Sequence, residues 1–403
     1  MIFVFYFFAA VLIFLGYQSL RGGIYYLQFF KQELAKPESN FAPFASIIVP
    51  CRGLDQDLRE NLTALFLQDY PNYEVIFAVD DETDESVKII KEVSRKGAKE
   101  TESKFVIAGK AICSSQKVHN LREAVLAVSE ASEIFVFVDS DARPGKVWLK
   151  NLVAPLQSGE IGCATGYRWF VSKRGGFSPQ LRAVWNASIA SALGANRKNN
   201  FCWGGATAIR RETFEKLEIR EKWRGTLSDD FTVTRIMKAA KLPIYFVPRC
   251  LTATIEDCAF GELVEFSTRQ MKITRVYAPD LWKASFAGSF LFTATFWTGV
   301  ALLFFLSGWH FRLTLFLLSL IFTLGAGKAW LRLNAAKLVL KDFEKELNRQ
   351  FIWQITLWTI TPALYFYNCF RALLSRKIIW RGIEYNLSSA TSTEILSDNR
   401  QIK

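Results

Sequence analysis

Residues 133–141 are EIFVFVDSD, a run of apolar residues that ends in two carboxylates. Its length and near-continuous apolarity are typical of a strand buried in a parallel sheet. Helical patterns separate it from similar runs upstream, as in the leucine-rich segment 55–69. This alternation predicts βαβ units and an α/β fold with a mostly parallel, doubly wound sheet. The upstream runs are SIIVPC at 46–51, EVIFAVDD at 74–81 and KFVIAG at 104–109.

The composition excludes several classes of protein. Half of the 403 residues are hydrophobic, which excludes a disordered chain. Seven cysteines without a C-x-x-C pair disfavour a disulfide framework or a zinc ribbon, and two histidines, His119 and His310, are too few for a histidine-rich metal centre. The net charge of +12 suits nucleic acid, a membrane surface or an anionic nucleotide. Much of that excess flanks the apolar segments, so no nucleic-acid partner is predicted.

The N-terminal residues predict a membrane anchor. Residues 2–20 contain no charge, and about 20 apolar residues are enough for a helix to cross a bilayer. A cleaved signal peptide is disfavoured because no basic segment precedes the run and no small-residue cleavage site follows it. The first cation, Arg21, lies on the C-terminal flank, which predicts an external N-terminus and a cytosolic domain after it.

The C-terminal third is apolar again. Segments 284–309 and 311–328 predict a transmembrane hairpin, and a further span is predicted over about 351–370, interrupted by Pro362. Basic residues follow that last segment, so a full crossing conflicts with the positive-inside rule, and a proline-broken re-entrant hairpin is the alternative. We therefore predict a membrane anchor, a cytosolic domain, an interfacial amphipathic segment, a transmembrane region and a polar tail, over 1–30, 31–266, 267–283, 284–382 and 383–403.

Asp139 and Asp141 form the strongest chemical signal, an Asp-x-Asp at a strand end before a turn proline, Pro144. Ligands bind beyond the carboxyl ends of strands in such sheets. Two carboxylates there favour a hard cation such as Mg²⁺ or Mn²⁺, which bridges them to a diphosphate. The alternative is that both residues only cap a turn.

A second signal lies at the ends of the first two strands. Arg52, in the PCRG loop at 50–53, can bring a guanidinium to a nucleotide, and Asp80 or Asp81 can accept hydrogen bonds from a uracil or ribose edge. The alternatives are a surface cation for Arg52 and a turn signal for the two aspartates.

Asp229 and Asp230 stand at a predicted helix start, where the helix dipole favours acidic residues. A carboxylate in a cleft is also a plausible general base for an alcohol. Downstream, Arg269, Gln270 and Arg275 lie on a short amphipathic stretch, for which an interfacial helix is the alternative.

In order, these segments resemble the family 2 glycosyltransferases, within them the membrane-bound ceramide glucosyltransferase-like branch, from about Ser46 to Trp282. The resemblance implies a cytosolic GT-A domain with a Rossmann-like sheet. It implies a nucleotide-facing acidic motif, a metal-binding Asp-x-Asp and a catalytic pair in which Asp230 is the base. Those motifs fall on Asp80 and Asp81, on Asp139 and Asp141, and on Asp229 and Asp230.

The resemblance also implies two less acidic elements. Lys117 and Asn120 are similar to an element that faces the nucleotide, and Trp203, Gly204 and Gly205 to a segment that lines the acceptor site. The family's final motif departs here, because Arg275 is followed by Val276 and not by Trp. Arg275 is the preferred diphosphate contact, with Arg269 and Gln270 beside it, and the missing Trp weakens an analogy with processive polysaccharide synthases.

The function predicted is an inverting, metal-dependent transfer of a sugar from a nucleotide-sugar donor, a UDP-hexose, to a lipid hydroxyl at the cytosolic face of the cell membrane. Transfer to a polyprenyl phosphate or a polysaccharide is an alternative reaction. A non-catalytic nucleotide-binding membrane scaffold is an alternative from another class. The donor sugar, the acceptor lipid, the choice between Mg²⁺ and Mn²⁺, and the oligomeric state stay open.

Overall fold

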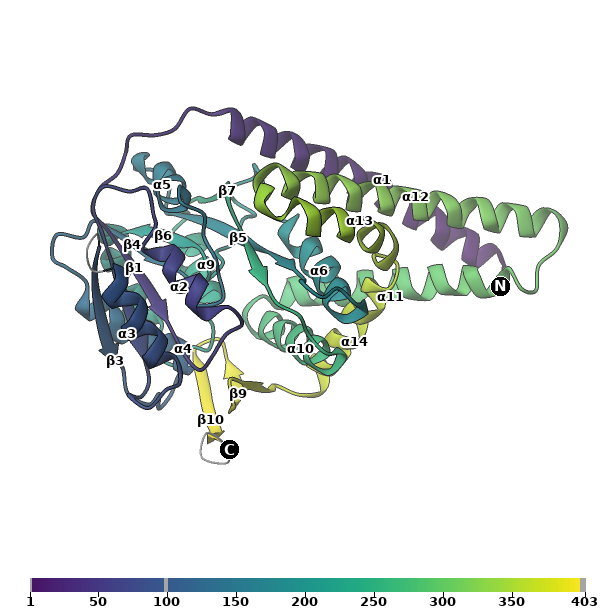
Figure 1. Cartoon of the computed structure of the whole chain (residues 1–403). Coiled ribbons are helices and arrows are strands. Elements are labelled where there is room, and N and C mark those ends of the chain that lie inside the picture. Colours follow the sequence, from purple (N-terminus) through teal and green to yellow (C-terminus); the bar gives the residue numbers. More distant parts are fainter. Residues whose placement is uncertain (1, 98–100, 399–403) are drawn as a thin grey trace. The chain divides into compact units, whose positions relative to one another are not determined.

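The computed structural model describes residues 2–97 and 101–398, which divide into two compact units (Figure 1). The first, here called the α/β unit, consists of Glu33–Phe170, Ala192–Glu256 and Arg376–Lys403. The second, here called the helical unit, consists of Met1–Gln32, Val171–Ser191 and Asp257–Ser375. Both units are discontinuous in sequence, which differs from the contiguous domains predicted above.

A seven-stranded sheet forms the centre of the α/β unit, and it confirms the predicted α/β fold with a mostly parallel sheet. Strand β1 pairs in parallel with β2 and β4, and β2 pairs in parallel with β3. Only β6 is shown to run against its neighbours, β4 and β5. The strand order is β3 (Glu102–Ile107), β2 (Tyr73–Val79), β1 (Ala45–Pro50), β4 (Ile134–Phe137), β6 (Thr207–Arg210), β5 (Cys163–Val171) and β7 (Ile244–Ile255).

Helices cross between these strands, and their starts follow from local sequence. Ser115 caps α4 by accepting the Val118 amide, and Ser228 caps α9 by accepting the Phe231 amide. Such caps satisfy amides that have no partner within the helix. The helices are α2 (Leu58–Leu65), α3 (Ser86–Gly97), α4 (Gln116–Ala124), α5 (Trp148–Val153), α7 (Arg211–Lys216), α8 (Ile219–Lys222) and α9 (Asp229–Ala239), with 3-10 turns at Val125–Ala127 and Ala154–Gln157.

The C-terminal residues form an antiparallel three-stranded sheet that belongs to the α/β unit, in yellow in Figure 1. The sequence predicted only a polar tail here and extended the membrane region to residue 382. Buried Ile383, Tyr385 and Leu387 alternate with more exposed residues, the period-2 pattern of a strand with one covered face. The strands are β8 (Lys377–Trp380), β9 (Ile383–Ser389) and β10 (Ser392–Asp398).

Three helices of the described residues are long and apolar enough to cross a membrane: α1 (Ile2–Ala35), α11 (Pro279–Leu302) and α12 (Gly308–Val339). The segment predicted over about 351–370 as a span interrupted by Pro362 is broken next to that proline, and no helix of this segment is among the candidate spans of the described residues. Two 14-residue helices, α13 (Glu344–Leu357) and α14 (Thr361–Leu374), occupy this region, with a 3-10 turn at Lys341–Phe343 before them. Each is roughly 21 Å long, short of the roughly 30 Å of a hydrocarbon core. Pro362 lies in the first turn of α14, where a missing amide costs no hydrogen bond.

The remaining helices of this unit are α6 (Phe177–Ala190) and α10 (Phe260–Tyr277). Helix α6 is buried on most sides, and its Trp185 shares an apolar cluster with Leu263 of α10 and Leu364 of α14. Residues Val171–Ser191, which include α6, belong to the helical unit, whereas the sequence predicted them within the domain 31–266. The predicted interfacial segment 267–283 is also no separate element, because α10 ends at Tyr277 and α11 begins at Pro279.

The C-terminal sheet and the main sheet belong to the same unit, although they are far apart in sequence. Two candidate spans, α11 and α12, separate the main sheet from these strands along the chain.

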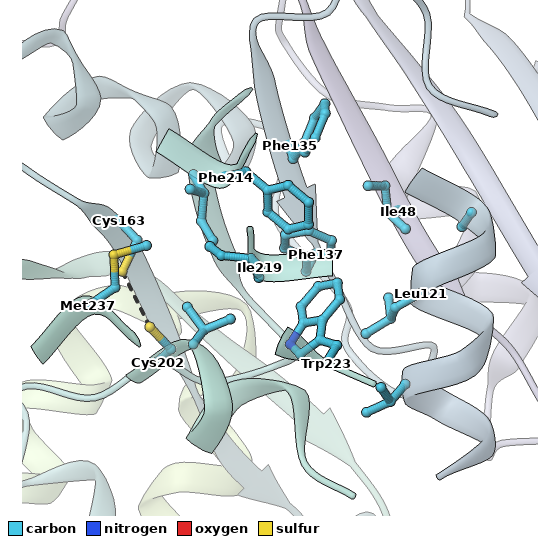
Figure 2. Close-up of a cluster of buried hydrophobic side chains, with 14 of the residues drawn as sticks. Ile48, Leu121, Phe135, Phe137, Cys163, Cys202, Phe214, Ile219, Trp223 and Met237 are labelled. Carbon is cyan, nitrogen blue, oxygen red and sulfur yellow. Dashed lines mark hydrogen bonds between the residues drawn. The ribbon is translucent and has the colours of Figure 1, made fainter. Parts of the chain in front are cut away.

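An apolar cluster beside β4 positions the start of α9. Figure 2 shows Phe137, Phe214 and Trp223 lying next to one another. The ring centroids of Phe137 and Trp223 are 5.3 Å apart, and those of Phe214 and Trp223 are 5.5 Å apart. The Trp223 indole N–H donates to the carbonyl of Asp229 at 3.2 Å. The apolar cluster therefore holds the backbone at the first residue of the acidic pair 229–230.

Replacing Phe214 by Ala should lower the free energy of unfolding by about 3–5 kcal/mol, because a buried ring leaves a cavity when it is removed. The melting temperature of the full chain in detergent measures this effect. Leu126→Ala is the control, since 63% of that side chain's surface is exposed and its removal should change the melting temperature little. Equal melting temperatures for the two variants would show that this cluster does not support the fold.

Candidate active site

Asp139 and Asp141 follow β4 and face two cations. The Lys117 ammonium lies 2.7 Å from Asp139 Oδ1. Arg168 donates to Asp141 Oδ2 at 3.0 Å and lies 3.7 Å from Asp139 Oδ2. The Arg168 guanidinium also stacks 4.9 Å from the ring of Trp203. The Asp-x-Asp pair is therefore held by side chains from α4 and β5.

The two aspartates differ in protonation behaviour. Burial favours the neutral form of Asp139, but Lys117 and Arg168 outweigh burial and hold its pKa below the usual value. Burial raises the pKa of Asp141 to about 6, against Arg168 and together with the negative charge of Asp139. Asp141 Oδ1 is buried and has no hydrogen-bond partner among the described residues. An oxygen that is desolvated without a partner is a place where a ligand gains binding energy.

Lys117 joins this pair to the second acidic motif. Its ammonium lies 3.0 Å from Asp229 Oδ1 as well as 2.7 Å from Asp139 Oδ1. Burial lowers the pKa of Lys117, but Asp139, Asp229 and Asp230 outweigh burial and raise it above the usual value. Burial raises the pKa of Asp229 to about 6, with Lys117 opposing and Asp230 adding to the shift. Two motifs far apart in sequence thus share one cation, whose side chain is 17% exposed.

Asp230 lies in the first turn of α9. Its Oδ1 accepts hydrogen bonds from the Ser228 hydroxyl and from its neighbour's amide, Phe231 N–H, at 2.7 Å. Its Oδ2 accepts the amide of Gly204 at 3.4 Å. These contacts fix the carboxylate against the segment predicted to line the acceptor site.

The residues Trp203, Gly204 and Gly205 pack directly on this cluster. A Cβ atom on Gly204 would lie 2.5 Å from Lys117 Nζ and 2.6 Å from Asp229 Oδ2, and one on Gly205 would lie 2.2 Å from the Trp203 ring. Trp203 is 5% exposed, and its indole N–H has no hydrogen-bond partner among the described residues. Only residues without side chains allow this close approach.

The ends of β1 and β2 carry the predicted nucleotide residues. Arg52 lies 3.8 Å from the buried carboxylate of Asp80. Asp81 instead accepts hydrogen bonds from the amide and the hydroxyl of Thr83. These contacts agree with the alternative interpretation of Asp81 as a turn residue. The buried Asn120 amide donates to the carbonyl of Ala78 at 3.4 Å and accepts from Gln116 at 2.8 Å, so it also fastens α4 to the sheet.

The three remaining predicted residues, Arg269, Gln270 and Arg275, lie on α10 of the helical unit. Arg275 donates to the carbonyls of Ala372 and Leu373 at 2.6 and 3.0 Å, which completes the C-terminal end of α14. The Arg269 guanidinium stacks 5.6 Å from the ring of Phe266, and Gln270 is partly buried. Their roles toward a nucleotide stay predictions.

Sequence analysis missed Arg168, Asp55 and Arg381. Arg168 is the one charged residue in the strand CATGYRWFV at 163–171, and a cation in a buried strand was the available signal. Asp55 accepts the hydroxyl of Ser140, the middle residue of Asp-x-Asp, at 2.6 Å, and is ion-paired with Arg381. No local pattern connects residues so distant in sequence.

The fit of a divalent metal can be judged from the donor set. No group of three or more His, Cys, Asp or Glu able to hold a metal occurs in the described ranges. Asp139 and Asp141 supply hard oxygen donors, and the partnerless Asp141 Oδ1 is the donor best placed for a cation. Two carboxylates fit a Mg²⁺ or Mn²⁺ ion whose other ligands come from a phosphate-bearing substrate.

Comparison with known families decides the class of the protein, since residues 7–393 match the family described as glycosyl transferase family 21. The chain belongs to glycosyl transferase family 21. Ceramide glucosyltransferase 3 of Caenorhabditis elegans is 28% identical over 201 residues, which are 48% of this chain and 42% of that protein. Ceramide glucosyltransferase 1 of the same organism is 29% identical over 85 residues, 21% of this chain and 18% of that protein. The matched stretches span less than half the length of these relatives.

Solved structures similar to this family 21 chain are more distant. Mannosyltransferase PcManGT of Pyrobaculum calidifontis, in complex with GDP-Man and Mn2+, is 17% identical with a TM-score of 0.44, covering 91% of this chain and 99% of that chain. Glucosyl-3-phosphoglycerate synthase of Mycobacterium tuberculosis, in complex with Mn2+ and UDP-glucose, is 16% identical with a TM-score of 0.36, covering 61% and 80%. Residue roles are not transferred at these values.

Gly204→Ala should reduce glycosyl transfer by about 100-fold, because its Cβ displaces Lys117 or Asp229 and a small misplacement in a catalytic site is costly. Turnover of the purified full chain measures the loss, and the melting temperature reports whether the fold survives. Gly159→Ala is the matched control, since a Cβ there meets open space. Wild-type turnover in Gly204→Ala would contradict the described packing.

Proposed function

We propose that this family 21 chain is an inverting, metal-dependent glycosyltransferase that moves a hexose from a UDP-sugar to a lipid hydroxyl. The observation that carries the proposal is Lys117, whose ammonium contacts both Asp139 and Asp229. A donor-side acidic motif and an acceptor-side acidic motif are thereby within one side chain's reach. Single displacement needs the diphosphate and the acceptor hydroxyl at adjacent positions.

The donor half of the site consists of cations and carboxylates around Asp-x-Asp. Asp141 and Asp139 would hold the divalent cation, which would supply positive charge that neutralises the diphosphate. Arg52 and Asp80 at the end of the sheet serve the nucleotide, supported by their 3.8 Å ion pair and burial. Lys117 and Arg168 supply fixed positive charge in a buried site, where it acts more strongly than in water.

The acceptor half contains the base. Asp230 takes the proton from the lipid hydroxyl as its oxygen attacks the anomeric carbon, and the bond from that carbon to the diphosphate oxygen breaks. Ser228 and the Phe231 amide orient the carboxylate through Oδ1. The unpartnered indole N–H of Trp203 is available to a hydroxyl oxygen of a bound sugar or acceptor. Arg275, Arg269 and Gln270 are proposed as further diphosphate contacts.

A lipid acceptor is supported by the membrane helices and by the relatives named ceramide glucosyltransferases. An amphiphilic acceptor keeps its tails in the bilayer and presents only its hydroxyl to the aqueous phase. We place the α/β unit on the cytosolic side of the cell membrane, since Arg21 and the basic residues of 328–350 flank the candidate spans there. The lipid bilayer is therefore a structural partner and the source of the acceptor.

Sugar transfer in detergent-solubilised membranes tests the proposal, with a panel of labelled UDP-sugars and mixed lipid extract. Wild type should give a glycolipid that disappears in EDTA and returns with Mg²⁺ or Mn²⁺. Asp230→Asn should lose about 100-fold or more in turnover, the usual size of a general-base effect. Glu218→Gln, at an exposed position outside the cluster, is the control.

If Asp230→Asn transfers sugar at the wild-type rate, Asp230 is not the base. If product forms in the presence of EDTA, the reaction does not require a divalent metal. Product only with polyprenyl phosphate or a non-UDP donor would replace the substrates proposed here. No product with any donor would favour the non-catalytic scaffold.

The pH dependence of transfer tests the state of the acidic cluster. The pKa values of Asp229 and of Asp141 are both raised to about 6, so both carboxylates are charged at neutral pH and become protonated as the pH falls through 6, and the Lys117→Gln variant distinguishes Asp229 from Asp141. Lys117 then loses one of its two partners, and turnover should fall on the acid side with a midpoint near pH 6. In Lys117→Gln the residual activity should fall at higher pH, because Lys117 lowers the pKa of Asp229. Turnover that is flat from pH 7.5 to 5 would contradict this assignment.

A further inference from the structure

Arg381 is a cation of the C-terminal sheet that lies beside the Asp-x-Asp loop of the same unit. Its Nη2 is ion-paired with Asp55, and its Nη1 donates to the carbonyl of Arg52 at 3.0 Å. The other oxygen of Asp55 accepts the Ser140 hydroxyl at 2.6 Å. One carboxylate therefore connects Arg381 to the residue between Asp139 and Asp141. Arg381 also interacts electrostatically with Asp139 and Asp141. Burial lowers the pKa of Arg381, the nearby carboxylates, Asp139 and Asp141 among them, raise it, and Arg381 in turn lowers the pKa of Asp139.

The rest of the C-terminal sheet meets other segments that border the proposed donor site. The Tyr385 hydroxyl accepts the amide of Gln116, the residue before Lys117, at 3.1 Å. Asp398 lies 3.9 Å from Arg52. A Cβ atom on Gly225, in the loop before α9, would lie 2.4 Å from the carbonyl of Thr391. The sheet thus contacts the PCRG loop, the start of α4 and the approach to the catalytic pair.

The backbone at Arg381 is held in an uncommon conformation. Arg381 and Gly382 form the two-residue turn between β8 and β9, and both have positive φ, 52° and 76°. Asn, Asp or Gly would fit the first position at lower cost than Arg. Strained positions persist where surrounding contacts hold them, and they cluster at ligand sites. Here the contacts that hold the turn are those of the guanidinium itself.

A purely structural clamp is the competing explanation for Arg381. Its described contacts use two of the five N–H donors of a guanidinium, and 38% of the side chain's surface is exposed. The Arg381 guanidinium is planar and has N–H donors beyond those two contacts, so it can bind two phosphate oxygens at once, which a lysine ammonium does less well. Asp139, Asp141 and Asp55 are three negative charges close together, and a bound diphosphate would add more negative charge. Cations beside these residues would therefore stabilise the substrate-bound state.

We propose that Arg381 binds the diphosphate of the nucleotide-sugar donor, so that the C-terminal sheet forms part of the donor site. The inference rests on the proposed function. During transfer the electron pair of the broken bond between anomeric carbon and phosphate oxygen stays on the leaving diphosphate, and Arg381 stabilises that charge. The acceptor's proton goes to Asp230.

Equilibrium binding of UDP and of uridine to the full chain in detergent, with Mn²⁺ present, tests this proposal. Arg381→Gln should weaken UDP binding about tenfold or more, as expected for a lost hydrogen bond to a charged group, and leave uridine binding within about twofold. Arg381→Lys retains the charge and should recover part of the UDP affinity. Arg376→Ala is the matched control, because Arg376 bonds within the same sheet, to the Ser388 carbonyl at 2.8 Å.

Each outcome decides between the two explanations. Equal losses of UDP and uridine binding in Arg381→Gln, or a lowered melting temperature with unchanged UDP binding, would identify a structural clamp and overturn the proposal. Wild-type UDP affinity in Arg381→Gln would overturn it while leaving the proposed function intact. A wild-type chain that binds neither UDP nor GDP would overturn the donor class, and this proposal with it.

Discussion

The ammonium of Lys117 is the contact on which the rest of the site depends. Asp139 follows strand β4 and Asp229 begins helix α9, and their two carboxylates repel each other. A cation at 2.7 and 3.0 Å from the two makes their proximity stable. Gly204 is required beside it because any side chain would occupy the space of the ammonium and of Asp229. The two acidic motifs, which we propose as the donor and acceptor halves, are therefore joined by one cation.

Packing below the site supports this arrangement. Phe137, Phe214 and Trp223 belong to one apolar cluster, and the Trp223 indole N–H donates to the carbonyl of Asp229. Figure 2 shows Cys163 and Cys202 near Met237, to one side of the aromatic rings. The two sulfur atoms are 3.3 Å apart. A rigid apolar base allows charged groups to be held near one another at its edge.

Both units are discontinuous in sequence. Helix α6 packs among the helices of the helical unit, and the C-terminal strands after α14 belong to the α/β unit. The candidate spans α11 and α12 lie between these strands and the main sheet in sequence. The C-terminal sheet thereby brings Arg381 to Asp55 and Arg52 of the same unit.

The sequence by itself determined the strands 46–51, 74–81 and 133–141, the membrane segments at both ends, the Asp-x-Asp at 139–141 and the acidic pair at 229–230. Those features are local, because apolar periodicity and strand-end carboxylates are visible within a few residues. Only the tertiary structure decided that Lys117 joins the two motifs, that Arg168 contacts Asp-x-Asp, and that Arg381 contacts Asp55 beside it. These depend on contacts between residues far apart in sequence and on the burial that fixes them, which no local pattern encodes.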